Sequence, residues 1–356
     1  MISIIGAGPV GGYAAYLLAK SGEKVRLYEE HDKIGKPVQC TGITTDAIDK
    51  VIKVDDSIIV NKVSVSRVYS PSNDYVDVNM KKPDYIFDRA GLDNFIVNMA
   101  LTQGVEIIYG KRFTGYREEN GKIKMQFNDN EIVETDYLIG ADGVNSAVAK
   151  IMNDKKRNFL YGTQARVEMG IEDRRVFETF MGVGDFAWIV PEDEKTARIG
   201  IIGNRDSAAG FMDFIKKRNG KILEYQGGLV PLYDPRLKIQ KGRVMIIGDA
   251  ATQVKPTTYG GIVPGMLAAQ QLAKDIDNYE KNFRKTAGKD LKLGLYIRKL
   301  MNKFTKEDYN RMITLCKKEK VLEILNTANR DYPGSFIFKL IMAEPRFLRF
   351  GLNVFY

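Results

Sequence analysis

Two glycine-rich segments, more than two hundred residues apart, contain the residue types of a nucleotide-binding loop. The first is Gly6 to Gly12 (GAGPVGG), which follows a short apolar run. Gly6 permits a tight turn, Gly8 lets the backbone approach a pyrophosphate, and Gly11 permits close packing between a helix and a strand. The N-terminus of the next helix offers free N–H groups and a positive dipole end to the anion. This fingerprint predicts a bound dinucleotide cofactor.

The second segment is Gly242 to Ile262 (GRVMIIGDAATQVKPTTYGGI). Its apolar strand ends in Gly248-Asp249, and a loop then opens into a helix. The Asp249 carboxylate is well placed to accept hydrogen bonds from ribityl hydroxyls. The N–H groups of Gly261 and Ile262 are expected to face the N1/O2 edge of a flavin, where negative charge develops on reduction. We therefore expect FAD rather than NAD or NADP, because its ribityl chain and flavin extend beyond the first segment.

Four single residues complete this part of the pattern. Glu29 lies 23 residues after Gly6, where a carboxylate binds the adenosine ribose and repels a 2′-phosphate. Arg89 opens a helix and is expected to reach the flavin side or the phosphates; the alternative is a plain surface arginine. Phe113 follows a strand and is expected to line the adenine pocket through its backbone. His31, the only histidine, is expected at the surface, which gives a histidine-dependent mechanism little support.

A strand–helix–strand unit must position these residues. Ser3–Ile5 and Val25–Tyr28 read as strands and Pro9–Lys20 as the helix between them. The pattern then predicts antiparallel strands in 51–78, a helix at 88–101, strands at 105–109 and 137–140, and a hairpin at 122–133. Four alternating segments, at 164–169, 176–181, 186–190 and 196–202, predict a further antiparallel sheet, interrupted by a helix at 211–218. From residue 265 onward the chain reads as mostly helical.

The order of these elements predicts an α/β fold with an α+β insert. We expect a discontinuous Rossmann-like FAD-binding domain from residues 1–50, 80–150 and 240–280. An antiparallel-sheet substrate domain is expected from 51–79 and 151–239, followed by a helical region at 281–356. The chain of 356 residues is long enough for one or two such domains.

Composition indicates the cellular compartment in which the protein works. The two cysteines, Cys40 and Cys316, do not make a disulfide framework, so we expect a reducing cytosol. The sequence shows no signal peptide and no long uncharged apolar run, which favours a soluble or peripheral protein. No metal site is predicted.

The net charge of +9 is concentrated at the C-terminal end. Residues 281–356 contain 17 Lys/Arg and 7 Asp/Glu, a net of +10. One interpretation is a basic face that meets an anionic membrane surface; the other is a set of solvated helical faces. Nucleic acid is not expected as a partner, because no recognised binding module is present. Aromatic residues in this region favour the membrane: Phe336, Phe338, Phe347, Phe350, Phe355 and Tyr356.

The order of four motifs resembles that of the para-hydroxybenzoate hydroxylase-like flavoproteins, over roughly residues 1 to 270. These motifs are GAGPVGG, Asp88-Arg89, GADGVNSAVAK and IIGDAATQVKPTTYGG. Within that superfamily the chain is most similar to the geranylgeranyl reductases. Three segments carry the finer resemblance: KPVQCTG (36–42), GDFAWIVP (184–191) and SAVAK (146–150). The chain departs from the second motif at Val190, where phenylalanine is usual, and Phe186 fills its aromatic position.

The resemblance implies FAD and the reduction of isolated isoprenoid double bonds, with a di-geranylgeranyl glycerolipid as substrate. It places Cys40 near the flavin, either as a proton donor, or in a mobile loop that closes the site, or through its backbone alone. A long polyprenyl chain needs an apolar tunnel. The residues expected to line it are Phe186, Trp188, Pro191, Tyr259 and Val263. The residues expected to bind FAD are Gly6, Gly8, Val10, Gly11, Gly12, Glu29, Cys40, Thr41, Ile43, Arg89, Phe113, Asp249, Gly261 and Ile262.

Several points stay open from the sequence. No second dinucleotide fingerprint is present, so the electron donor is either transient NAD(P)H or a ferredoxin-like protein. An FAD-dependent monooxygenase or halogenase of the same fold is the main alternative, although a halogenase would require a second tryptophan where Phe186 stands. A flavoprotein that only transfers electrons is a further alternative. A lipid substrate favours a cytoplasmic protein, peripheral on the inner face of the cell membrane.

Overall fold

The computed structural model describes residues 1–153 and 156–352. Its backbone contacts define two compact units, each assembled from three separate stretches of chain. Unit 1 comprises Met1–Val38, Arg89–Phe159 and Val230–Lys292, and unit 2 comprises Gln39–Asp88, Leu160–Leu229 and Leu293–Tyr356. These units group residues 39–50 and 80–88 with the antiparallel sheet, because the strand at Ile43–Thr44 pairs with the strand at Tyr75–Phe87. The expected domain boundaries stay a prediction.

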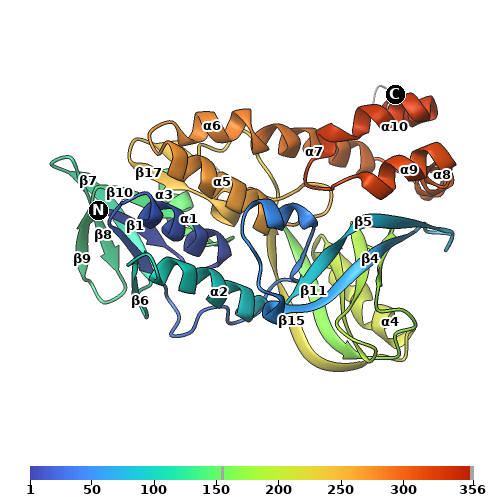
Figure 1. Cartoon of the computed structure of the whole chain (residues 1–356), viewed down its shortest axis with the longest axis horizontal. Coiled ribbons are helices and arrows are strands. Elements are labelled where there is room, and N and C mark those ends of the chain that lie inside the picture. The colour runs from blue at the N-terminus through green and yellow to red at the C-terminus, as the bar shows by residue number, and fades with distance from the viewer. Residues whose placement is uncertain (154–155, 353–356) are drawn as a thin grey trace. The chain divides into compact units, whose positions relative to one another are not determined.

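Unit 1 is built on a six-stranded sheet in the order β16-β17-β10-β1-β2-β6. Figure 1 labels β1, β6, β10 and β17 of this sheet. All of its neighbouring strands pair in parallel except β16 and β17. The strands are β1 (Ile2–Ile5), β2 (Val25–Tyr28), β6 (Glu106–Ile108), β10 (Tyr137–Gly140), β16 (Gln240–Lys241) and β17 (Val244–Ile246). The central strands are buried and apolar, as expected of a parallel sheet covered on both faces.

Within the described part of unit 1, five helices and a small second sheet complete the fold. The helix α1 contacts both α2 and α5. The helices are α1 (Pro9–Lys20), α2 (Arg89–Leu101), α3 (Ala147–Met152), α5 (Ile262–Lys274) and α6 (Tyr279–Lys285). The second sheet contains β7 (Phe113–Glu119), β8 (Lys122–Phe127) and β9 (Ile132–Thr135). A further helix, α7 (Ala287–Met301), contains the boundary between the two units.

Unit 2 is built on an eight-stranded sheet in the order β15-β11-β14-β13-β12-β4-β5-β3. Its strands are β3 (Ile43–Thr44), β4 (Ile59–Tyr69), β5 (Tyr75–Phe87), β11 (Phe159–Glu168), β12 (Val176–Met181), β13 (Phe186–Pro191), β14 (Thr196–Gly203) and β15 (Lys221–Pro231). Pairing is antiparallel from β11 through β14 and β13 to β12, and from β4 through β5 to β3, whereas β12 and β4 pair in parallel. Apolar side chains of β11, β13 and β14 form a core with α4 (Phe211–Lys216), which Figure 1 shows against this curled sheet.

The C-terminal part of unit 2 is helical, as the sequence predicts. The helices are α8 (Lys306–Cys316), α9 (Glu319–Thr327), α10 (Ile337–Ala343) and α11 (Leu348–Leu352), and α8 and α9 pack against β5. Short 3₁₀ turns occur at Asp46–Lys50, Asp56–Ile58, Arg205–Gly210, Gly248–Ala251, Pro333–Ser335 and Pro345–Phe347. The expected α/β class, with an inserted antiparallel sheet and a helical C-terminal region, is confirmed.

The aromatic residues of this helical region differ in their exposure to solvent. Phe338 is 70% exposed, whereas Phe350 is buried against Phe304 and Phe347. Phe336 and Phe347 are half-buried. Treating Phe350 as a surface aromatic was therefore wrong, because helix packing removes it from solvent. Phe355 and Tyr356 lie outside the described residues.

Candidate functional site

Glycines form a cradle at the N-terminus of α1. A Cβ atom on Gly6, which has a φ of 100°, would lie 2.5 Å from the carbonyl oxygen of Ala141. A Cβ on Gly11 would lie 2.0 Å from the carbonyl oxygen of Gly6, so both positions exclude a side chain. On Gly8, by contrast, a Cβ would meet no described atom within 4 Å, and no side chain caps the helix there. The backbone around Gly8 therefore leaves room for a pyrophosphate at the positive end of α1.

Glu29 is held beside this cradle at the end of β2. Its Oε2 accepts the backbone N–H of Ala7 at 2.9 Å, and its Oε1 accepts the backbone N–H of His31 at 3.0 Å. The Nδ1 atom of His31 lies 2.7 Å from the same Oε1. The Glu29 side chain is 12% exposed and the His31 side chain 50% exposed. His31 is thus at the surface, as expected, but it also orients Glu29, a role that sequence reasoning missed.

The two glycine-rich segments meet inside unit 1. A Cβ on Gly248, which has a φ of 64°, would lie 3.3 Å from the side chain of Val10. A Cβ on Gly265 would lie 2.5 Å from Cγ2 of Val10. The first turn of α1 therefore packs directly against the strand–loop–helix segment that follows β17, and Gly12 packs against Val97 of α2.

Asp249 lies beside the start of α5. A Cβ on Gly261 would lie 2.7 Å from Oδ1 of Asp249, so carboxylate and helix N-terminus adjoin. Asp249 keeps part of its surface accessible, and loss of hydration raises the pKa of its carboxyl to about 6, while the charges of Arg89 and Arg157 oppose that rise. Hydrogen-bond donors of a ligand would stabilise the ionised form of such a carboxylate.

The two arginines near Asp249 are both largely buried. Arg89 donates from Nη2 to both carboxylate oxygens of Asp93, at 2.8 and 2.9 Å, and its side chain is 11% exposed. The alternative of a plain surface arginine was therefore wrong. Arg157 donates to the carbonyl oxygens of Ala250 and Ser146 at 3.2 and 3.3 Å. It stands in a basic run, Lys155 to Arg157, that carries no motif, so no sequence signal distinguished it.

A buried chain of hydrogen bonds sets the path of the loop after β17. The amide of Gln253 accepts the N–H of Gly248 at 2.7 Å and donates to the Tyr279 hydroxyl at 2.6 Å. That hydroxyl donates to the carbonyl oxygen of Ile246 at 3.0 Å. Sequence reasoning missed both side chains because Tyr279 lies 26 residues after Gln253.

The other predicted residues of unit 1 differ in exposure. Phe113 is buried at the start of β7, and Ile262 and Val263 are buried in the first turn of α5. Tyr259 is half-buried with a φ of 57°, in the left-handed region that few non-glycine residues adopt. The neighbouring Thr258 hydroxyl is buried and has no hydrogen-bond partner among the described residues. Their contacts with cofactor or substrate stay predictions.

In unit 2, the Cys40 segment is anchored to β5. Cys40 itself is exposed, and its Sγ accepts the N–H of Gly42 at 3.3 Å. The Gly42 carbonyl oxygen accepts the N–H of Phe87 at 2.9 Å. Ile43 then pairs with Ile86 in the β3–β5 ladder. These contacts leave the thiol accessible on a backbone that is fixed immediately after it.

Trp188 shares a hydrogen-bond acceptor with this segment. Oε1 of Gln164 accepts the indole Nε1–H of Trp188 at 3.1 Å and the hydroxyl of Thr41 at 2.5 Å. The indole lies on Gly200, where a Cβ would be 2.1 Å from Cζ2 of Trp188, and its ring centroid lies 5.9 Å from that of Phe186. The structure thus joins two motifs that the sequence separates by more than one hundred residues.

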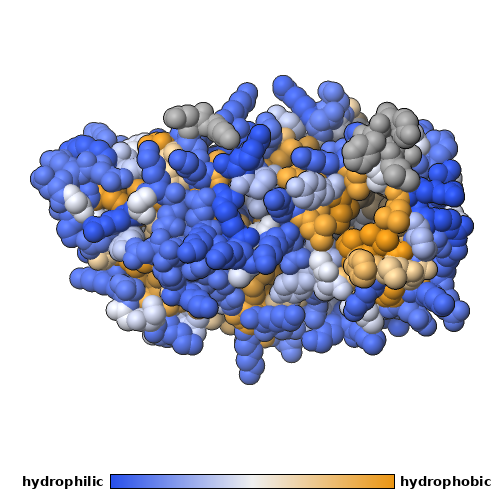
Figure 2. Space-filling view, turned by 90° about the horizontal axis from the view of Figure 1, so that it is seen from above, coloured by the Kyte–Doolittle hydropathy of each residue, from blue (hydrophilic) through white to orange (hydrophobic). Residues whose placement is uncertain are grey.

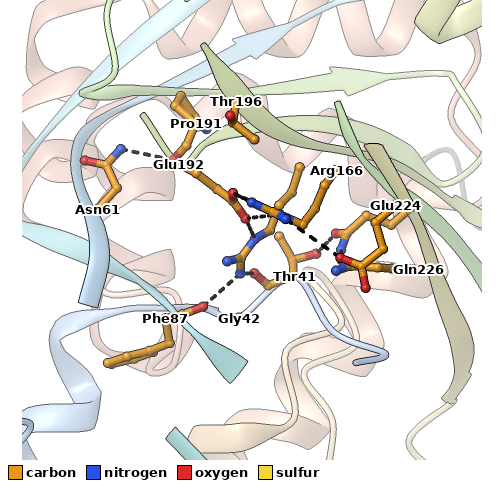
Figure 3. A network of polar contacts seen from close by, with 12 residues as sticks. Thr41, Gly42, Asn61, Phe87, Arg166, Pro191, Glu192, Thr196, Glu224 and Gln226 are labelled. Carbon is orange, nitrogen blue, oxygen red and sulfur yellow. Dashed lines mark hydrogen bonds and ion pairs between the residues drawn. The ribbon is translucent and has the colours of Figure 1, made fainter. Parts of the chain in front are cut away.

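Among the predicted substrate residues of unit 2, Phe186 and Trp188 are half-buried, whereas Pro191 is buried. It is buried at the end of β13, and its carbonyl oxygen accepts the side-chain amide of Asn61 at 3.0 Å (Figure 3). Its contact with substrate stays a prediction.

Comparisons with known proteins agree with this geometry. The model of the FAD binding domain matches residues 1–159. Digeranylgeranylglycerophospholipid reductase 3 of Methanosphaera stadtmanae is 30% identical over 88% of this chain and 89% of its own length. The chain belongs to the digeranylgeranylglycerophospholipid reductase family. The reductase of that name from Methanothrix thermoacetophila is 28% identical over 90% of this chain and 92% of its own.

Solved structures share the fold of this chain. A geranylgeranyl bacteriochlorophyll reductase-like protein from Thermoplasma acidophilum superposes with a TM-score of 0.83 and 22% identity, covering 98% of this chain and 97% of the other. The tetracycline destructase Tet(51) has a TM-score of 0.65 and 15% identity, covering 91% of this chain and 96% of the other.

This protein is therefore an FAD-dependent oxidoreductase. The residues of unit 1 fit this cofactor. A bound dinucleotide would fill the open cradle at Gly8 and bond to the fixed carboxylate of Glu29. It would also offer a partner to the Thr258 hydroxyl, which has none among the residues that the structure describes.

Proposed function

We propose that this enzyme reduces the carbon–carbon double bonds of geranylgeranyl chains, most naturally those of an archaeal-type glycero(phospho)lipid. One observation carries the choice of substrate: the aromatic pair Phe186–Trp188 lies on the same sheet as the Cys40 segment and is tied to it through Gln164. An apolar polyprenyl chain fits such a wall, because it has no polar group that needs a partner. The names of the relatives support the same class of lipid.

FAD, when bound and reduced, supplies the hydride. The residues of unit 1 would hold it, with the backbone at Gly8 facing the pyrophosphate, Glu29 the ribose and Asp249 the ribityl chain. In unit 2, Phe186 and Trp188 orient the alkene and exclude water. The accessible thiol of Cys40 is the proposed source of the proton for the other carbon. The reductant is either NAD(P)H or a ferredoxin-like protein.

Anaerobic turnover tests this function. The purified enzyme, reduced with dithionite, is incubated with a digeranylgeranyl glycerolipid, and the products are weighed by mass spectrometry. A gain of two hydrogens for each reduced double bond is expected. No gain with any polyprenyl lipid would contradict the proposal, and an oxygen-dependent gain of one oxygen would favour a monooxygenase. Asp249→Ala is the matched control, since it should lose bound flavin colour and activity together.

We further propose that the enzyme works while peripheral on an anionic membrane, on its cytoplasmic side. Among the described residues, no helix is long and apolar enough to cross a membrane. Apolar side chains gather at the right of the surface in Figure 2. In α10 and α11, Phe338, Met342 and Leu348 are 70%, 67% and 53% exposed, and Lys339 and Arg349 beside them are also exposed. Exposed apolar residues interspersed with cations match the interface of an anionic bilayer.

Vesicle sedimentation tests the membrane contact. Phe338→Glu combined with Met342→Glu should release the enzyme from phosphatidylglycerol vesicles, whereas Tyr225→Glu, on a residue of β15 that is 64% exposed, should not. Binding should weaken as salt is raised, because salt screens the basic residues. Equal binding of the double variant and the wild type would exclude this surface.

A further inference from the structure

A buried ion pair in unit 2 fastens the Cys40 segment to the sheet. Arg198, on β14, has a side chain that is 7% exposed, and its Nε donates to Oε1 of Glu192 at 2.6 Å. Its Nη1 donates to the carbonyl oxygen of Phe87 at 2.9 Å and also to that of Thr41. Figure 3 shows Glu192 above the Thr41, Gly42 and Phe87 backbone. One guanidinium therefore joins the end of β5 to the residue that follows Cys40.

Glu192 is ionised, and both Arg166 and Arg198 donate hydrogen bonds to its carboxylate. Its oxygens also accept Nε of Arg166 at 3.0 Å and Nη2 of Arg166 at 2.7 Å. Burial alone would raise the pKa of the Glu192 carboxyl, but the bonds from Arg166 and the charge of Arg198 outweigh it and lower the pKa. A buried ion pair is weak evidence for stability, because desolvation offsets the attraction. The Arg198 donors instead fix the positions of two backbone segments.

Gln164 makes a second connection to the same segment. It is 3% exposed, and its Oε1 accepts from both Thr41 and Trp188, as described above. Its Nε2 donates to Oε1 of Gln226 at 2.5 Å, which fixes the orientation of the amide. A Cβ on Gly228, also in β15, would lie 3.2 Å from Cβ of Gln39, so the segment before Cys40 is in contact with the sheet too.

We infer that Arg198 and Gln164 are positioning residues that hold the Cys40 thiol and the Trp188 indole in one fixed arrangement. The inference rests on the proposed function, in which the thiol delivers a proton to an alkene that lies along the indole. A proton donor must stay within hydrogen-bond reach of its target. Because both groups belong to one sheet-bound network, displacing the Thr41 backbone moves the thiol away from the wall that orients the lipid.

The chain provides two intrinsic probes of this arrangement. Trp188 is the only tryptophan, so intrinsic indole emission reports on it alone. Cys40 and Cys316 are the only thiols, and desolvation raises the pKa of Cys316 to about 12. In a Cys316→Ser background, the rate of alkylation by iodoacetamide therefore measures the accessibility and mobility of Cys40 in the FAD-loaded enzyme.

Arg198→Gln and Thr41→Val should each change the alkylation rate of Cys40 by up to about tenfold, the effect of losing one buried hydrogen bond, because the exposed thiol then leaves its fixed position beside the N–H of Gly42. Thr41→Val should also shift the Trp188 emission, because the shared acceptor loses one of its donors. Arg175→Gln, which removes an exposed ion pair with Asp173 on the same unit, is the matched control and should change neither readout. Arg198→Lys keeps the charge but not the forked donors, so it should restore the arrangement only in part.

Kinetics separate positioning from a purely structural role. In the folded, FAD-loaded variants, kcat for the lipid should fall about tenfold while KM stays within a factor of about two. Unchanged alkylation and emission, or an unchanged kcat, would overturn the inference. Thr41→Val keeps the test decisive if Arg198→Gln does not fold. Alkylation and emission need no lipid, so a failure of the proposed reaction would be distinguishable from a failure of this network.

Discussion

The carboxyl of Asp249 should make the flavin-free protein less stable at neutral pH than at pH 4. Its pKa is raised from 3.8 to about 6, first by loss of hydration, with Arg89 and Arg157 opposing the rise. The folded protein therefore holds this proton up to a higher pH than the unfolded chain does. The contribution of Asp249 to the free energy of unfolding therefore falls as the pH rises between 3.8 and about 6. Each pH unit in that window lowers it by at most about 1.4 kcal/mol. The full loss is at most about 3 kcal/mol.

Asp249→Asn removes this titration while keeping the size of the side chain. Urea unfolding of the flavin-free wild type and variant, followed by circular dichroism from pH 4 to pH 8, gives the difference in free energy of unfolding. That difference should grow in favour of the variant by up to about 3 kcal/mol as pH rises to about 6, and stay constant above it. A difference that is flat from pH 4 to pH 7, or that changes in the opposite direction, would refute the reasoning.

Asp136 provides a control of opposite sign. Bonds from Lys122 and the N-terminal ammonium lower the pKa of its carboxyl to about 2. Its contribution to stability is present above pH 3.8 and is lost only as the pH falls toward 2. The stability difference between Asp136→Asn and the wild type should therefore be constant from pH 5 to pH 7, below the range in which the N-terminal ammonium titrates. A slope in that range would show that the assay reports some other group.

Three further predictions concern single side chains. Cys40→Ser should keep stoichiometric FAD but slow lipid reduction, and unchanged rates would leave this residue with a backbone role only. Gly8→Ala should fold like the wild type and lose FAD affinity by equilibrium dialysis, whereas Gly11→Ala should lower the thermal midpoint, because only the second Cβ meets backbone at 2.0 Å. Gly200→Ala should displace the indole of Trp188 and change its emission without loss of FAD, since its Cβ would overlap that ring.

Short segments of the sequence were enough to predict the cofactor. A turn that needs glycine, a helix N-terminus and a strand-end carboxylate involve residues close in sequence, so spacing alone places Gly6, Gly8, Gly11 and Glu29. The apolar run before Gly248 likewise predicted a buried strand. The exposure of α10 and the burial of Phe350 were not predictable in this way, because they depend on how helices pack rather than on composition.

What the sequence determined by itself is the FAD-binding fold, because this rests on motifs in which neighbouring residues share one turn or one helix end. The class of enzyme came from the resemblance of KPVQCTG and GDFAWIVP to the geranylgeranyl reductases. Tertiary structure alone decided which side chains hold those motifs in place. Arg198 reaches Thr41 across 157 residues, and Gln164 reaches it across 123. Arg157 reaches Ala250 across 93. An arginine or glutamine that belongs to no motif gives no local signal, and its role appears only when folding brings its partner within hydrogen-bond distance.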